Sequence, residues 1–128
     1  MEYLTVEDVM MIHRAEIGLN HPIVDFGLLE SAIMRPQQSV GGQDAYPSVH
    51  LKAAALMHSL ARNHPFVDGN KRTAAVATLT FCLINGQIIR MGDSDLIALT
   101  LDVAEGQLDV PTIAKRLEDR SVAIEDPS

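Results

Sequence analysis

The sequence predicts an all-α protein, a single domain of about six helices with a non-helical flap before the third main helix. The first observation is composition: a chain of 128 residues with 47% hydrophobic and 21% charged residues is typical of one globular domain. The second is that apolar residues recur at helical spacing in successive stretches. The third is that capping residues, prolines and glycines mark the ends of these stretches. We therefore treat residues 1–128 as one domain.

The first two helices are separated by a short break. Thr5 followed by Asp8 has the spacing of a capping interaction and predicts a helix over about residues 5–16. Residues 18–22 interrupt the pattern, because they contain a glycine and a proline. A second helix is expected over about residues 25–34.

The flap lies between the second and third helices. Residues 36–47, PQQSVGGQDAYP, contain two prolines and paired glycines, which makes them a poor helix and too short for a domain linker. The alternative to a functional flap is an ordinary surface loop. Pro47 and Ser48 then start a third helix that continues to about Asn63.

The fourth helix is the most apolar of the chain. Residues 71–85 are apolar nearly all round, which is typical of a central buried helix, and Gly86 ends it. Residues 87–91, QIIRM, are expected to form a short extended link.

Two more helices and a tail complete the chain. One helix is expected to be capped by Asp93 or Ser94 and to end at residue 104, and the other covers residues 109–119. The tail, residues 121–128, is expected to fray.

Charge and composition exclude several classes of partner. The net charge is −7, whereas broad nucleic-acid binding needs a cationic surface. No stretch has the ~18 uninterrupted apolar residues of a membrane span, and the N-terminus lacks the basic region of a signal peptide. The single cysteine, Cys82, excludes an internal disulfide and is interpreted as core packing. We therefore expect a cytoplasmic protein with no direct nucleic-acid or membrane partner.

The chemistry of the chain is concentrated in residues 64–74, HPFVDGNKRTA, a polar turn that opens into an apolar helix. The Asp-Gly-Asn turn at residues 68–70 is typical of a helix start, so the N–H groups of residues 70–72 are expected to lie free at a helix N-terminus. Such a terminus binds anions. Lys71 and Arg72 add two cations, which makes phosphate the natural ligand.

Other groups in this turn suit phosphate chemistry as well. Asp68 is a hard oxygen ligand, and Mg²⁺ is usually held by one or two carboxylates together with substrate phosphates. His64 is the candidate general base for an attacking hydroxyl, whereas His13 and His21 are interpreted as partner or surface residues. Gly69 permits a close backbone approach. The alternative is a solvated helix start without a ligand, but so many reactive groups in so short a stretch favour a site.

The stretch HPFVDGNKR, residues 64–72, resembles the signature of the Fic/Doc family, HxFx[DE]GN[GK]R, at every fixed position. Lys71 followed by Thr73 and Ala74 resembles the Doc, or death-on-curing, branch, the toxins of toxin–antitoxin pairs. Four other segments are similar to Doc-type sequences: residues 3–13, 28–39, 41–47 and 52–63. The resemblance implies a compact all-helical Fic fold, ATP with Mg²⁺ as cofactors, and transfer of part of the nucleotide to a protein hydroxyl.

The resemblance also implies roles for individual residues. It makes His64 and Arg72 catalytic and Asp68 the metal ligand. The residues that would bind the nucleotide phosphates are Gly69, Asn70, Lys71 and Arg72. The flap residues that would position the target are Val40, Gly41, Gly42, Asp44 and Tyr46.

Two departures from the wider family bear on the reaction. Family members that transfer AMP typically have a second glycine where this chain has Lys71 and a second arginine where it has Ala75. The Doc branch with this pattern is associated with the opposite nucleotide orientation. The resemblance therefore favours kinase chemistry on a protein hydroxyl, with translation elongation factor Tu as the target. An AMP transferase, or a catalytically silent module that binds a nucleotide or an antitoxin, is the alternative.

A third departure concerns control. Many family members carry an inhibitory helix with Ser or Thr, three arbitrary residues, Glu and then Gly or Asn. The nearest candidate here is Glu105-Gly106, but Leu101 stands at the Ser/Thr position. We therefore expect a cognate antitoxin that binds in trans and lays an amphipathic helix into a groove beside the flap.

Overall fold

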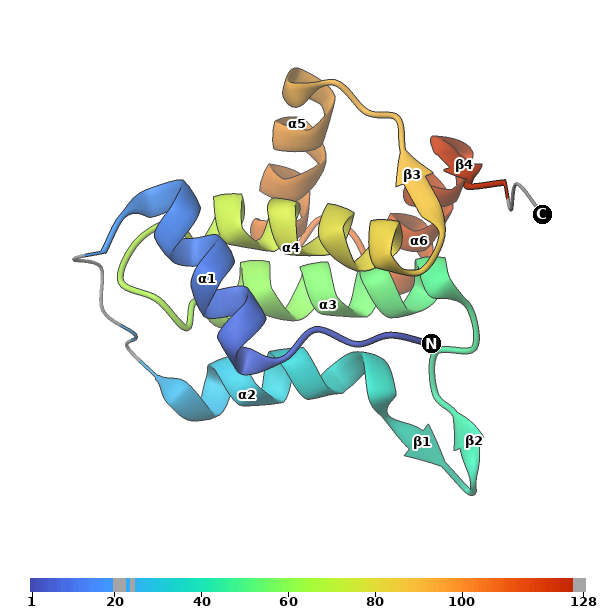
Figure 1. Cartoon of the computed structure of the whole chain (residues 1–128), viewed down its shortest axis with the longest axis horizontal. Coiled ribbons are helices and arrows are strands. Elements are labelled where there is room, and N and C mark those ends of the chain that lie inside the picture. Colours follow the sequence, from blue (N-terminus) through green and yellow to red (C-terminus); the bar gives the residue numbers. More distant parts are fainter. Residues whose placement is uncertain (20–22, 24, 126–128) are drawn as a thin grey trace.

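The computed structural model describes residues 1–19, 23 and 25–125. These residues contain six α-helices (Figure 1). The prediction of an all-α domain with six main helices is therefore confirmed. The helices are α1 (Val6–Ile17), α2 (Phe26–Met34), α3 (Val49–Asn63), α4 (Asn70–Ile84), α5 (Asp93–Ala104) and α6 (Val110–Asp119). The break expected at residues 18–22 lies partly outside the described residues, and His21 is not among them.

Local capping chemistry explains why four of the helices begin where the sequence predicts. Thr5 and Asp8 form a reciprocal capping box at the start of α1. The N-cap side chains Asp25, Ser48 and Asp109 each accept a hydrogen bond from a backbone N–H of α2, α3 and α6 respectively. Helix α5 is different, because its N-cap is Gly92 and neither Asp93 nor Ser94 caps it. That prediction was wrong, and α5 begins one residue earlier than a side-chain cap would place it.

The centre of the molecule is the antiparallel pair α3 and α4. Helix α3 also packs against α2, α5 and α6, and its alanines 53–55 are fully buried, which allows close helix packing. Burial raises the pKa of the Cys82 thiol in α4 to about 12, in agreement with core packing. The last turn of α4 differs from the expected all-round burial, because Leu83 and Ile84 are exposed.

Two small antiparallel pairs of strands complete the fold. A 3₁₀ turn, η1 (Arg35–Gln37), leads into β1 (Ser39–Val40) and β2 (Gln43–Asp44), which together form the flap. The link expected at residues 87–91 contains β3 (Gln87–Ile89), which pairs with β4 (Ser121–Ala123). The expectation that the tail frays is therefore wrong for β4, whereas residues 126–128 lie outside the described residues.

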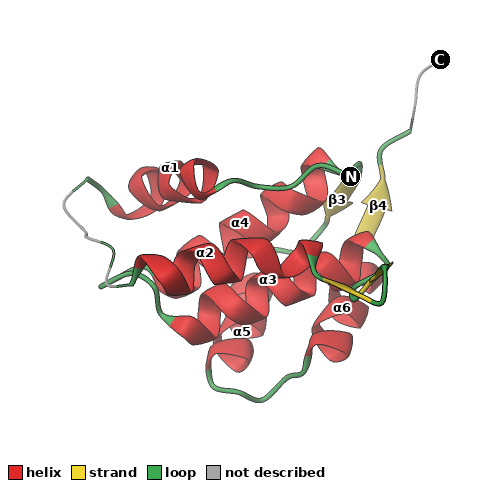
Figure 2. Cartoon of the chain, turned by 90° about the horizontal axis from the view of Figure 1, so that it is seen from below, coloured by secondary structure: helices red, strands yellow, loops and turns green. Residues whose placement is uncertain are grey.

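The two ends of α3 carry different features. The flap joins the N-terminal end of α3, and the loop between α3 and α4 joins its C-terminal end (Figures 1 and 2). A helix rises 1.5 Å per residue, so the 15 residues of α3 separate these features by roughly 22 Å. In the described part of the chain, no helix is both long and apolar enough to cross a membrane.

Candidate functional site

The loop between α3 and α4 opens into a cavity of about 500 Å³. The cavity brings together all six site residues that the sequence predicts in the motif, with two apolar neighbours. The lining residues are Ile17, His64, Val67, Asp68, Gly69, Asn70, Lys71 and Arg72. A candidate base, a carboxylate, a helix N-terminus and two cations therefore share one pocket.

His64 ends α3 in a left-handed conformation, with φ 49° and ψ 57°. It is the only non-glycine residue with positive φ in the described part of the chain. Left-handed backbone costs a non-glycine residue about 1–2 kcal/mol, and such strain concentrates at functional sites. The conformation breaks the helix at His64, so that this residue lines the pocket at the end of α3.

Gly69 precedes α4 and fits only because it lacks a side chain. Its φ is +81°, and a Cβ there would collide with Cγ1 of Ile17 in α1. Its N–H donates a hydrogen bond of 2.8 Å to the Asp68 carboxylate oxygen Oδ1. Gly69 therefore lets α1 approach the loop closely and helps to orient the carboxylate.

The Asn70 side chain closes the loop on Phe66. Its Oδ1 accepts from the Phe66 N–H at 3.0 Å, and its Nδ2 donates to the Phe66 carbonyl at 2.9 Å. The helical ladder of α4 begins with the Thr73 N–H, which donates to the Gly69 carbonyl at 2.9 Å. The N–H groups of residues 70–72 precede that ladder, so Asn70 can offer a ligand its backbone N–H.

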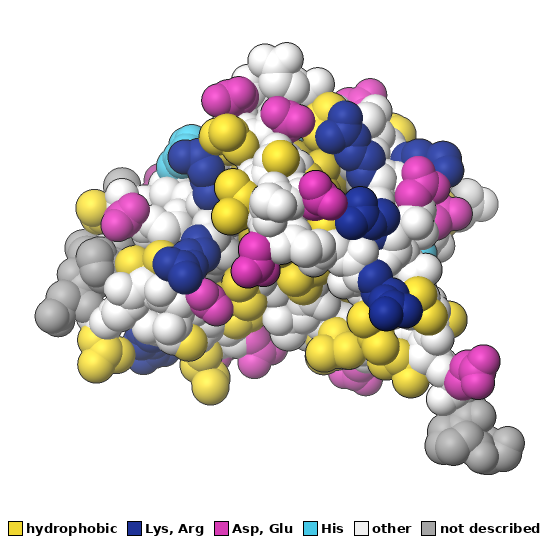
Figure 3. All heavy atoms as spheres, turned by 90° about the horizontal axis from the view of Figure 1, so that it is seen from above, with side chains coloured by type: hydrophobic (Ala, Val, Ile, Leu, Met, Phe, Trp, Pro, Cys, Tyr) yellow, Lys and Arg dark blue, Asp and Glu magenta, His cyan; other side chains and the backbone are white. Residues whose placement is uncertain are grey.

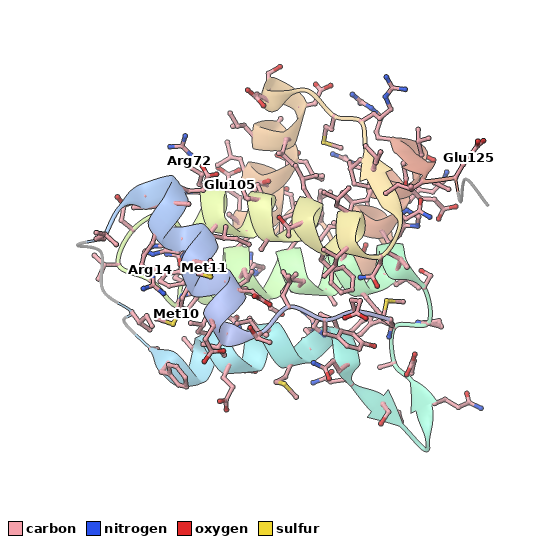
Figure 4. The ribbon with its side chains drawn as sticks, viewed as in Figure 1. Met10, Met11, Arg14, Arg72, Glu105 and Glu125 are labelled. Atoms are coloured by element: carbon pink, nitrogen blue, oxygen red, sulfur yellow. The ribbon has the colours of Figure 1, made fainter. Side chains whose placement is uncertain are left out.

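Arg72 is ion-paired to a residue that the sequence analysis missed. Its Nε lies 3.2 Å from Oε2 of Glu16, and its side chain is 66% exposed. Figure 4 shows Arg72 reaching outward at the end of the molecule where α1 ends and α4 begins. Glu16 is distant in sequence, so the motif alone gave no signal for this pair.

His13 is buried and is not a surface residue, which corrects that half of its interpretation as a partner or surface residue. It is 3% exposed, and its ring stacks on Phe66 with centroids 3.8 Å apart and planes 9° apart. Its Nε2 lies 2.9 Å from the Asp68 carbonyl oxygen. The helical spacing of His13 and the buried Val9 in α1 was the signal that could have predicted this burial.

The flap residues lie away from this pocket, at the opposite end of α3 (Figure 1). Val40 is 75% exposed, and Gly41 and Gly42 form the positive-φ turn of the hairpin. Asp44 binds Nζ of Lys52, a buried lysine of α3, at 3.1 Å. Tyr46 Oη accepts a hydrogen bond of 2.9 Å from Arg35 Nε.

A second, apolar groove adjoins the pocket and shares Lys71 and Arg72 with it. Its volume is about 730 Å³, and its lining comes from α4, α5 and the end of α1. The lining residues are Glu16, Lys71, Arg72, Ala75, Val76, Leu79, Asp93, Leu96, Ile97, Thr100 and Leu101. Figure 3, which looks from above, shows hydrophobic side chains exposed among charges of both signs.

The pocket has a donor set that fits a magnesium nucleotide. Asp68 supplies one carboxylate beside the cations and N–H groups that suit phosphates. Mg²⁺ is typically held by one or two carboxylates plus phosphate oxygens, so Asp68 alone can supply the protein's share.

Comparison with known proteins gives three consistent findings. Residues 3–82 match the model of the Fic/DOC family. The chain is 48% identical over 118 residues to "Toxin Doc" of Mycolicibacterium smegmatis, covering 91% of each protein. It is 31% identical over 125 residues to "Protein kinase doc" of Escherichia phage P1, covering 91% of this chain and 94% of that relative.

Proposed function

The chain belongs to the Fic/DOC family, and from this premise we propose that it is a toxin that transfers the terminal phosphoryl group of ATP to a hydroxyl of a protein target. The observation that carries the proposal is that His64, Asp68 and the N-terminal end of α4 line the same pocket. Phosphoryl transfer needs positioning and charge stabilisation more than covalent chemistry, and this pocket offers both.

His64 acts as the general base in this proposal. It lines the pocket at the end of α3, where a target hydroxyl can approach it from solvent. A histidine takes a proton near neutral pH, and a well-placed base contributes ~10²–10⁴-fold to the rate. The hydroxyl oxygen attacks the terminal phosphorus, its proton passes to His64, and the bond to the ADP oxygen breaks.

The start of α4 binds the phosphates. The backbone N–H groups of residues 70–72 supply neutral donors, Lys71 a point charge and Arg72 a planar fork. Asp68 would hold Mg²⁺, which supplies charge neutralisation when it is bound with the nucleotide. Gly69 allows the loop to keep its close contact with α1.

Two positions favour phosphoryl transfer over AMP transfer. Lys71 lines the pocket where AMP-transferring relatives have a glycine, so its side chain takes space that the inner phosphates would use. Ala75 is buried, 8% exposed, and lines the apolar groove where those relatives have a second arginine. A nucleotide with its terminal phosphate at His64 suits this arrangement better than the reverse orientation.

We place the target among folded proteins and propose elongation factor Tu. The flap residues Val40 to Tyr46 keep their proposed role in positioning the target. Because α3 separates the flap from the pocket by roughly 22 Å, a target that contacts both must extend along α3. A folded protein offers a surface long enough to do so.

An antitoxin that binds in trans would control this activity in the cytoplasm. The apolar groove beside Lys71 and Arg72 suits an amphipathic helix, whose apolar residues recur every three or four positions. We place the antitoxin helix in this groove, at the pocket end of the molecule, rather than beside the flap. An acidic side chain of that helix would also meet the two cations.

Labelled ATP tests the chemistry. Purified protein is incubated with elongation factor Tu and Mg-ATP that carries the label on the terminal or on the α-phosphate. The proposal is supported if the target acquires label from the terminal phosphate and acquires none from the α-phosphate. Label from the α-phosphate would support AMP transfer, and no label with a stable nucleotide complex would support a silent binding module. Co-expression with a neighbouring gene product, followed by size exclusion, tests the antitoxin.

A further inference from the structure

One face of α1 contacts the motif of residues 64–72, although α1 lies about fifty residues earlier in the chain than this motif. Positions three and four apart share a helix face, and three such residues meet the loop or the start of α4: His13, Glu16 and Ile17. His13 is the most deeply buried of the three. Its Nε2 contacts the backbone of the loop at the Asp68 carbonyl oxygen.

The hydrogen bond from His13 fixes one peptide unit. The Asp68 carbonyl can only accept, so the His13 Nε2, at 2.9 Å, carries the hydrogen and donates it. The N–H of the same peptide unit belongs to Gly69 and donates to the Asp68 carboxylate at 2.8 Å. Because a peptide unit is planar, holding its carbonyl also sets the direction of its N–H.

We propose that His13 is a positioning residue that orients the Asp68 carboxylate through the Asp68–Gly69 peptide unit. This inference rests on the proposed function, in which Asp68 serves the magnesium nucleotide. His13 is not one of the described residues that line the pocket, so it acts through Asp68 and not on a ligand. The imidazole of His13 stacks on the Phe66 ring, and Asn70 holds the backbone of Phe66. These contacts keep the imidazole in place.

Two variants separate the hydrogen bond from packing. His13→Phe keeps an aromatic ring against Phe66 and removes the donor. His13→Gln removes the ring and offers an amide N–H at a similar reach. A donor role predicts that the Gln variant functions better than the Phe variant, whereas a packing role predicts the reverse. Val9→Ala, one turn earlier in α1 and fully buried, is the control for lost packing alone.

The first readout is magnesium-dependent ATP binding by calorimetry, without any target. Groups that orient a metal ligand typically contribute 10- to 100-fold to affinity or activity. We expect His13→Phe to weaken magnesium-dependent binding and to lower kcat by roughly tenfold or more, with the KM for the target unchanged. His13→Gln should recover most of this loss, and Val9→Ala should lower only the melting temperature.

The second readout needs no activity. Hydrogen exchange at the Gly69 amide reports directly on the peptide unit, and it should accelerate in His13→Phe more than in His13→Gln. Unchanged exchange and unchanged magnesium dependence in His13→Phe would overturn the inference, as would a Phe variant that outperforms Gln. If wild-type protein binds Mg-ATP but transfers no phosphoryl group, the proposed function fails, while calorimetry and exchange still decide the role of His13.

Discussion

The guanidinium of Arg72 lies 3.2 Å from the carboxylate of Glu16, so the motif arginine is ion-paired to α1. In the proposed function the same guanidinium binds phosphate, and Glu16 therefore competes with the nucleotide. Exposed ion pairs are worth ~0.2–1 kcal/mol, and Arg72 is 66% exposed. Glu16→Gln should therefore tighten Mg-ATP binding by about 1.4- to 5-fold, measured by calorimetry.

Asp102→Asn provides the matched control for this prediction. Asp102 pairs with Arg116 at 3.8 Å on another part of the surface, so its loss should leave nucleotide affinity unchanged. Weaker or unaltered binding in Glu16→Gln would show that Arg72 does not exchange Glu16 for phosphate.

A comparison of two glycines tests the contact between the loop and α1. Gly69 and Gly42 both have φ of +81°, but only at Gly69 would a Cβ meet Ile17. Alanine in this conformation costs ~1–2 kcal/mol at either position, and the clash adds ~1–3 kcal/mol at Gly69. Urea unfolding should therefore show Gly69→Ala as the less stable variant. Introducing Ile17→Ala together with Gly69→Ala should remove the additional loss of stability that the clash causes. Equal losses of stability in Gly69→Ala and Gly42→Ala would contradict the account.

Lys52 connects the two sides of the flap. It is 1% exposed, and its Nζ donates to the Pro36 carbonyl and to the Asp44 carboxylate, each at 3.1 Å. Lys52→Met leaves the Pro36 carbonyl without this partner, which should cost ~1–3 kcal/mol of stability. If the flap positions the target, KM for the target should rise while ATP affinity stays constant.

Lys115→Met is the control for removing a lysine. Lys115 pairs with Asp119 on the exposed surface of α6, so its loss should change stability by less than ~0.5 kcal/mol. A Lys52→Met protein with wild-type stability and wild-type KM would remove Lys52 from the flap's support and leave the flap without a demonstrated role.

The stability of the protein should fall as the pH drops below 6.5, in part through His58. Burial, followed by the charges of Arg35 and Arg62, lowers the pKa of His58 from its ordinary value of 6.5, and Asp109 opposes this shift. The unfolded chain therefore binds a proton at higher pH than the folded protein does. The contribution of His58 to stability is complete above pH 6.5 and is lost as the pH falls toward the lowered pKa.

His58→Asn tests this dependence. The His58 Nδ1 accepts from Arg35 Nη1 at 2.9 Å, and the asparagine amide oxygen can accept in its place without titrating. Urea unfolding from pH 7 down to about pH 5 should show a flatter decline in the variant than in wild type. Parallel curves would exclude His58 as a source of the pH dependence.

Local chemistry explains what the sequence could predict. The capping residues Thr5, Asp25, Ser48 and Asp109 act within three residues, so the helix starts were predictable. The pocket was predictable for the same reason, because the motif brings its groups together within one loop and one helix start. The pairing of β4 with β3 depends on residues more than thirty positions apart, which no local pattern reports.

Residues outside the motif could not be assigned in the same way. Glu16, His13 and Lys52 each act through a contact that only the folded chain creates. A buried charge or imidazole in an apolar stretch has a weak signature, because the same residue types also occupy exposed helix positions. Their roles therefore depend on packing between helices and not on sequence spacing.

The most direct test of the central claim is the intact mass of elongation factor Tu after incubation with the protein and Mg-ATP. The account predicts a gain of one phosphoryl group with wild-type protein. His64→Asn should reduce this by ~10²–10⁴-fold while keeping the fold, because asparagine tolerates the left-handed conformation of residue 64. A gain of AMP, an unmodified target, or an equal gain with His64→Asn would contradict the account.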